Sequence, residues 1–157
     1  MKIIRTLIFV GVIGYIAYSY FGGAERDASG QIVSEGTLDA FSIRVGDCTN
    51  DQEDGSEISS VIAIPCSEPH DNEFYHSFQI SHPEFPGEDI VFEEGYEGCY
   101  NQFEAFVGID YESSVLDIYT LYPTKESWDQ QNDREILCAL YHIDLEKLEG
   151  SAKGLAI

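Results

Sequence analysis

The chain has 157 residues, which is enough for one compact domain of ordinary size. Its 29 Asp and Glu residues outnumber 8 Lys and Arg residues, so the net charge is −21. A surface this acidic repels nucleic-acid phosphates and anionic lipid headgroups, and the composition therefore argues against nucleic-acid binding. With 43% hydrophobic and 13% aromatic residues, the chain can nevertheless bury a core, which excludes disorder throughout.

The first segment of the chain is apolar and determines the compartment that we expect. Within residues 3–21 the only charged residue is Arg5, and the stretch approaches the roughly 20 residues that a membrane-spanning helix needs. Because Lys2 and Arg5 lie at its start, the positive-inside rule keeps the N-terminus in the cytoplasm. We therefore expect residues 1–22 to be a signal anchor, with the rest of the chain extracytoplasmic. The alternatives are a signal peptide cleaved after Ala24 and a buried core helix.

The segment after the anchor has a different composition. Residues 23–42 mix glycine, serine and charged residues without hydrophobic periodicity, which is typical of a flexible linker. We expect one extracytoplasmic domain at residues 43–146 and a polar C-terminal tail at residues 147–157.

The expected domain alternates strand-like segments with one long helix. Alternating apolar and polar residues predict strands at 41–45, 61–66, 73–80, 115–122 and 136–143. In the third of these strands the pattern places four side chains on one face: Phe74, His76, Phe78 and Ile80. Residues 88–107 are expected to form a helix that Gly108 ends, and its apolar stripe is Phe92, Tyr96, Cys99, Phe103 and Phe106. A short helical turn is expected at 124–132. This order predicts an α+β fold, an antiparallel sheet with one long helix packed on a face.

The chain contains four cysteines and no C-x-x-C motif, and an oxidising compartment would join them as two disulfides. Of the three possible pairings, the expected layout favours two bridges. Cys48 and Cys66 end neighbouring strands, whereas Cys99 on the helix faces Cys138 on the sheet. Free buried thiols and a zinc site are the alternatives, but the spacings lack the close ligand pair of a structural zinc site. We expect neither a metal nor a cofactor.

Functional groups are densest between Cys66 and Glu73. Asp71 follows His70 directly and could orient its imidazole, as a hydrolase requires. No glycine-framed nucleophile elbow surrounds the nearby Ser67, however. We therefore expect His70 and Asp71 to bond loop backbone before the following strand.

Several short motifs, in a fixed order, resemble the septum formation family. They are V-G-D-C at 45–48, P-C-S-E-P-H-D-N-E at 65–73, F-P-G-E-D at 85–89, and Y-P-T-K-E-S-W at 122–128, followed by Asp133, Arg134 and Cys138. The resemblance covers residues 43–144 and includes all four cysteines. It implies a membrane-anchored, extracytoplasmic protein of the Gram-positive type with disulfides and a role in cell division, and it assigns no catalytic residue. Asn132 stands where the family often has glycine, and asparagine also tolerates a left-handed turn.

The shared motifs single out a few residues as structural: His70, Asp71, Trp128, Asp133 and Arg134. Arg134 is one of only 6 basic residues after the anchor, where 29 acidic residues give a charge of −23. We therefore expect it to pair with a carboxylate, such as Asp71 or Asp133.

Together these features predict a single-pass membrane protein with a non-catalytic, disulfide-stapled interaction domain, active in septum formation, cell division or envelope assembly. Its acidic, tyrosine-rich surface suits an envelope protein with a basic patch, and no small-molecule substrate is indicated. One alternative is a cell-envelope hydrolase that uses His70, Asp71 and Glu73. Another is a domain that buffers cations through its carboxylates.

Overall fold

The computed structural model describes residues 22–52 and 59–157. The apolar stretch of the expected anchor lies outside these residues. Among the described residues, no helix has both the length and the apolar character needed to cross a membrane.

Most strands belong to one antiparallel sheet. Its six strands lie in the order β3 (Gly36–Asp39), β5 (Ser60–Ile64), β4 (Cys48–Asn50), β6 (Asn72–Gln79), β8 (Glu135–His142) and β7 (Leu116–Leu121). Two short strands, β1 (Glu25–Arg26) and β2 (Ile32–Ser34), form a separate hairpin. Short 3-10 helices occur at η1 (Ala40–Ser42) and η2 (Tyr111–Ser113). The α+β class and the antiparallel sheet are therefore confirmed.

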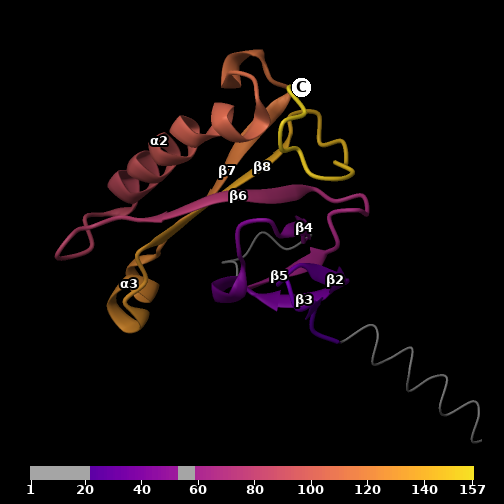
Figure 1. Cartoon of the computed structure of the whole chain (residues 1–157). Coiled ribbons are helices and arrows are strands. Elements are labelled where there is room, and N and C mark those ends of the chain that lie inside the picture. The colour runs from indigo at the N-terminus through magenta and orange to yellow at the C-terminus, as the bar shows by residue number, and fades with distance from the viewer. Residues whose placement is uncertain (1–21, 53–58) are drawn as a thin grey trace, which may run out of the picture.

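The long helix α2 (Glu88–Val107) packs against β6, β7 and β8 and crosses one face of the sheet, as Figure 1 shows. Its bounds match the expected helix, and Gly108 ends it in a left-handed conformation with φ 91°. The buried side differs from the expected stripe: Val91, Gly95, Cys99, Phe103 and Val107 face the sheet. Phe92 is half exposed, because the helix is rotated so that Val91 and Gly95 approach the strands in its place.

The second helix, α3 (Lys125–Gln131), lies where a helical turn was expected. Thr124 caps its N-terminus, with its hydroxyl accepting from the Ser127 backbone, while the Ser127 hydroxyl accepts from the Thr124 backbone. Asn132 ends it with φ 55°, the left-handed conformation expected of an asparagine in place of glycine.

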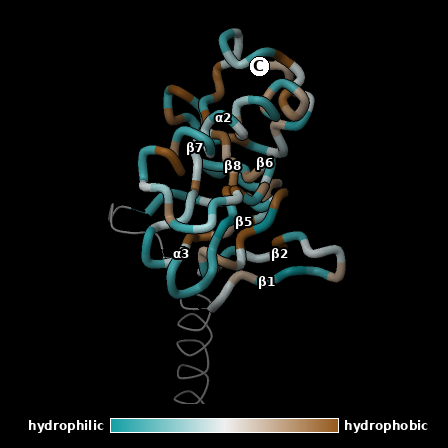
Figure 2. Tube along the Cα trace, turned by 90° about the vertical axis from the view of Figure 1, so that its left-hand side faces the viewer, coloured by the Kyte–Doolittle hydropathy of each residue, from teal (hydrophilic) through white to brown (hydrophobic). Residues whose placement is uncertain are grey.

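Apolar side chains fill both faces of the sheet. The larger cluster lies between the sheet and α2 and includes Tyr75, Phe103, Ile136 and Leu140. The smaller cluster, on the opposite face, includes Ile43, Phe74 and Ala139. Figure 2 shows hydrophobic positions along β5 and β8 inside the trace, with hydrophilic positions on the surrounding loops.

The expected alternation along β6 is interrupted by a bulge. Phe74 lies opposite Ala139 and His76 opposite Cys138, so Tyr75 is an extra residue in the ladder. A bulge shifts the register of one strand, and side chains on either side of it then change faces. The expectation that Phe74 and Phe78 share a face is therefore wrong: Phe74 packs in the smaller cluster and Phe78 against the larger one.

The region before residue 43 contains more regular structure than a linker. Strands β1, β2 and β3 all lie within the expected linker segment, and β3 pairs with β5. Arg26 forms a bidentate ion pair with the buried Asp47, at 2.6 and 2.7 Å. The hydrogen bond to Asp47 raises the pKa of Arg26 above its ordinary value. Residues 23–42 therefore lack hydrophobic periodicity because an ion pair and strand pairing, rather than an apolar stripe, fix them.

The expected strand at 41–45 is also wrong. Phe41 lies in η1, where the Asp39 carboxylate accepts a hydrogen bond from its backbone at 2.9 Å, and its side chain is exposed. The Asp47 carboxylate accepts from the Arg44 backbone at 2.7 Å and folds the following residues into a turn. Local side-chain hydrogen bonds of this kind compete with strand pairing. Of the expected strand, only Ile43 is buried.

The C-terminal segment is not a free polar tail. Leu148 and Ala152 are buried in the larger cluster. Leu148 also exchanges backbone hydrogen bonds with His70, at 2.9 and 2.8 Å. Residues 147–157 look polar in sequence because only a few of their side chains enter the core.

Candidate functional site

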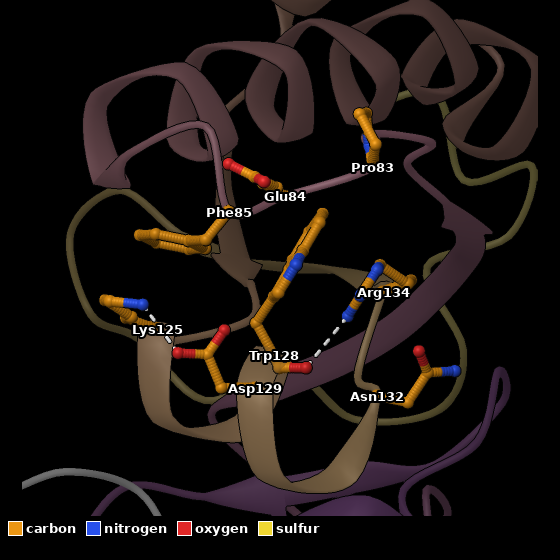
Figure 3. Close-up of a pocket in the computed structure, with 8 residues that line it drawn as sticks. All are labelled: Pro83, Glu84, Phe85, Lys125, Trp128, Asp129, Asn132 and Arg134. Atoms are coloured by element: carbon orange, nitrogen blue, oxygen red, sulfur yellow. Dashed lines mark hydrogen bonds and ion pairs between the residues drawn. The ribbon is translucent and has the colours of Figure 1, made fainter.

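A pocket of about 380 Å³ opens between α3 and the loop that precedes α2. Figure 3 shows its lining: Pro83, Glu84, Phe85, Lys125, Trp128, Asp129, Asn132 and Arg134. The loop contributes an aromatic ring and a carboxylate, and α3 with the turn after it contributes the rest.

Trp128 is the centre of this pocket. In Figure 3 its indole lies between the side chains of Phe85 and Arg134. The Phe85 ring meets it edge to face, with 5.6 Å between ring centroids, and the Arg134 guanidinium carbon lies 3.5 Å from the ring centroid. Both contacts are favourable for an electron-rich ring face, and they hold the indole in one orientation.

Arg134 is bound by backbone carbonyls rather than by a carboxylate. Its Nη1 donates to the carbonyl oxygens of Trp128, at 3.1 Å, and Asp133, at 2.6 Å. The expected ion pair with Asp71 or Asp133 is therefore wrong. The Asp133 carboxylate instead accepts from the Ser127 hydroxyl at 2.9 Å and from the Glu135 backbone at 3.1 Å. A guanidinium beside the last carbonyls of a helix also complements the helix dipole.

The charged groups of the pocket balance one another. Lys125 pairs with Asp129 at 2.5 Å across one turn of α3, and both side chains are exposed. Glu84 adds a second carboxylate, while Nε and Nη2 of Arg134 have no hydrogen-bond partner among the described residues. The pocket therefore offers an aromatic wall with both donors and acceptors at its rim, which suits a peptide segment better than a bare ion.

His70 and Asp71, expected to bond loop backbone, do so. His70 is fully buried, and its Nδ1 donates to the Glu68 carbonyl at 2.8 Å, so the proton of a neutral ring lies on Nδ1. Its Nε2 is buried and has no partner within the described part of the chain. Asp71 accepts from the Asp51 backbone at 2.8 Å and pairs with Lys147 at 2.6 Å.

Glu73 serves the C-terminal segment. It is buried, and its carboxylate accepts from the Ser151 hydroxyl at 2.5 Å and from the Ala152 backbone at 2.7 Å. His70, Asp71 and Glu73 thus have separate partners, and none of them lines the Trp128 pocket.

All four cysteines are paired as expected. Cys48 bonds Cys66 and Cys99 bonds Cys138, with Cα atoms 5.2 and 5.4 Å apart. Residues 22–52 and 59–157 contain no group of three His, Cys, Asp or Glu side chains able to hold a metal ion.

Sequence reasoning selected Trp128, Asp133 and Arg134 but missed the loop side of the pocket. Phe85 stands in the F-P-G-E-D motif of the family resemblance, so a signal existed. Its role could not be read from spacing, because 43 positions separate it from Trp128 and only the fold brings them together.

Comparison with known proteins identifies one family for this domain. Residues 45–155 match the family described as Septum formation. The match covers well over half of the chain, and the chain therefore belongs to the septum formation family. It matches none of the curated proteins and none of the solved structures with which it was compared.

Proposed function

We propose that this protein is a single-pass membrane protein whose extracytoplasmic domain takes part in cell division by binding another envelope protein, without catalysis. Membership of the septum formation family supports the role in division. The apolar stretch at residues 3–21 and the two disulfides support the membrane anchor and the oxidising compartment.

The Trp128 pocket is the observation that carries the proposal. It combines the partly exposed Phe85 ring, which is backed by the buried Trp128 indole, with exposed charges of both signs, an arrangement typical of the anchoring sites of protein interfaces. By contrast, His70 and Glu73 are buried, and the Glu73 carboxylate and the Nδ1 atom of His70 are bound by backbone or hydroxyl groups. We assign the pocket to a short segment of the partner.

Site-specific photo-cross-linking of the full-length protein in dividing cells tests this assignment. A photoreactive amino acid would replace Glu84, which is exposed at the pocket rim. The matched control replaces Glu25, which is exposed on β1. We expect a discrete adduct with an envelope protein from position 84 and none from position 25. Equal adducts, or none from position 84, would contradict binding at the pocket.

The topology is tested separately by fusing alkaline phosphatase after Ile157. That enzyme folds only in an oxidising compartment, so a C-terminal fusion should be active. An inactive fusion made at full length would place the domain in the cytoplasm and contradict the anchor orientation.

A further inference from the structure

A row of aromatic side chains runs along the outer side of α2. Phe92, Tyr96 and Tyr100 are four residues apart, and their ring centroids are separated by 6.2 and 6.5 Å. Tyr122 extends the row at one end, 5.9 Å from Phe92, and Tyr111 at the other, 5.5 Å from Tyr100. We call these five residues the aromatic row.

The aromatic row borders the core: Tyr96 and Tyr111 are partly buried and pack against the larger cluster, whereas the other three rings are exposed. The core side of α2 consists of Val91, Gly95, Cys99, Phe103 and Val107. By contrast, Phe92 is 50% exposed, Tyr122 39% and Tyr100 37%. Single exposed apolar residues are ordinary, but a row of neighbouring rings with three exposed members is typical of a surface that contacts a partner.

The row lies among carboxylates. Five acidic residues of α2 are exposed: Glu88, Asp89, Glu93, Glu97 and Glu104. Glu112, after the helix, accepts a hydrogen bond of 2.6 Å from the Tyr100 hydroxyl. The bond to Glu112 raises the pKa of Tyr100, which keeps that phenol neutral. The hydroxyl is therefore occupied, whereas the ring remains exposed.

Few basic residues lie near these carboxylates. His82 pairs with Glu94 of α2 at 3.0 Å, and Lys153 lies in the C-terminal segment that hydrogen-bonds the last turn of α2. The sequence contains no Lys or Arg between Arg44 and Lys125, an interval that includes α2, β6, η2 and β7. Strand β8, which also packs against α2, has none either. Helix α2 and the strands packed on it therefore carry carboxylates and aromatic rings but no Lys or Arg.

This combination selects a cationic ligand. Aromatic faces attract guanidinium and ammonium groups, and adjacent carboxylates add hydrogen-bonded ion pairs, which the planar guanidinium makes best. The same field repels anionic lipid, nucleic acid and a second copy of this acidic chain. We infer that the aromatic row docks a basic, arginine-bearing segment of a partner protein. This inference rests on the proposed binding function and names the chemistry of the partner.

Calorimetric titration of the full-length protein, held in neutral detergent micelles, tests the inference. The probe is a synthetic peptide of alternating arginine and serine, and its control carries citrulline in place of every arginine. We expect the arginine peptide to bind and the citrulline peptide not to bind. Removing two exposed rings with Phe92→Ala and Tyr100→Ala should weaken binding about five- to thirty-fold, since each exposed cation–π contact is modest. Unchanged affinity in that variant would overturn the inference.

A pair of charge reversals separates a local site from general attraction. Glu93→Lys with Glu97→Lys changes charge beside the row, whereas Glu25→Lys with Glu35→Lys makes the same change at exposed positions on and after the β1–β2 hairpin. We expect the first pair to weaken peptide binding at least tenfold more than the second. Equal weakening would show that only net charge acts and would also overturn the inference. Neither of these negative results would change the cross-linking expected at Glu84. The two experiments therefore distinguish a wrong assignment of the aromatic row from a wrong proposal of partner binding.

Discussion

At the scale of single residues, Arg134 shows how one side chain can serve both the fold and the pocket. One nitrogen donates to two carbonyl oxygens, at Trp128 and Asp133, while the guanidinium plane covers the indole of Trp128. A planar group with several donors can do all this together, whereas an ammonium group cannot. We therefore expect stability to depend on an arginine side chain at position 134, and not only on a positive charge there.

Arg134→Lys tests that argument. The substitution keeps the charge but removes the stacked plane and one of the two carbonyl bonds, so we expect a loss of about 1–2 kcal/mol in the free energy of unfolding. Lys125→Arg is the control, because its ion pair is exposed and should change stability by less than about 0.5 kcal/mol. Urea unfolding of both variants measures the difference, and equal stability would contradict a special role for the guanidinium.

Asp117 predicts how the stability of the fold changes at acidic pH. Burial alone would raise its pKa, but hydrogen bonds from Tyr111, the Ile118 backbone and Tyr141 outweigh burial, so the pKa lies below its ordinary value. A lowered folded-state pKa adds stability above the pKa of the unfolded chain, and that stability is lost as the pH falls through the folded-state pKa.

Asp117→Asn should therefore destabilise the protein near neutral pH, and the deficit should shrink as the pH falls below about 4. Unfolding curves of both proteins from pH 7 to pH 3 measure it. A deficit that stays constant over this range would show that the charge of Asp117 contributes nothing.

At the scale of elements, the sequence predicts the bounds of α2, α3, β7 and β8 well because each has a clear period or a cap, although the buried side of α2 differs from the predicted stripe. The prediction from sequence fails where a bulge or a local side-chain hydrogen bond interrupts the alternation of a strand. The extra Tyr75 in β6 exchanges the two faces, and the side-chain bonds of Asp39 and Asp47 replace an expected strand by a turn. The Trp128 side of the pocket follows from motif residues, whereas Phe85 reaches it only through long-range packing.

Gly98 tests how α2 meets the sheet. A Cβ atom at this position would lie 2.1 Å from the tip of the Phe78 ring. Alanine favours a helix over glycine by about 1 kcal/mol, but the ring would have to move, so we expect Gly98→Ala to destabilise by about 1–2 kcal/mol in net. Leucine lacks the ring tip, and in a Phe78→Leu background the same substitution should be neutral or stabilising. A double-mutant cycle by thermal unfolding measures this coupling, and additive effects would contradict the contact.

At the scale of the whole molecule, two disulfides cross-link elements that also pack against each other. Cys48–Cys66 links β4 to the turn after β5, and Cys99–Cys138 joins the middle of α2 to β8. They close loops of 18 and 39 residues, and the entropy lost by the unfolded chain corresponds to about 3 and 4 kcal/mol. The net stability of a domain is about 5–15 kcal/mol, so a reduced form would keep little of it.

Replacing each cysteine pair by alanine separates the two contributions. We expect Cys48→Ala with Cys66→Ala to lower the free energy of unfolding by about 3 kcal/mol. Cys99→Ala with Cys138→Ala should lower it by about 4 kcal/mol or more, because both sulfurs are buried in the core. Urea unfolding with and without reductant measures this, and reductant should affect each variant less than the native protein. If reductant leaves the native protein unchanged, the fold does not need an oxidising compartment, and the disulfides cease to support extracytoplasmic placement.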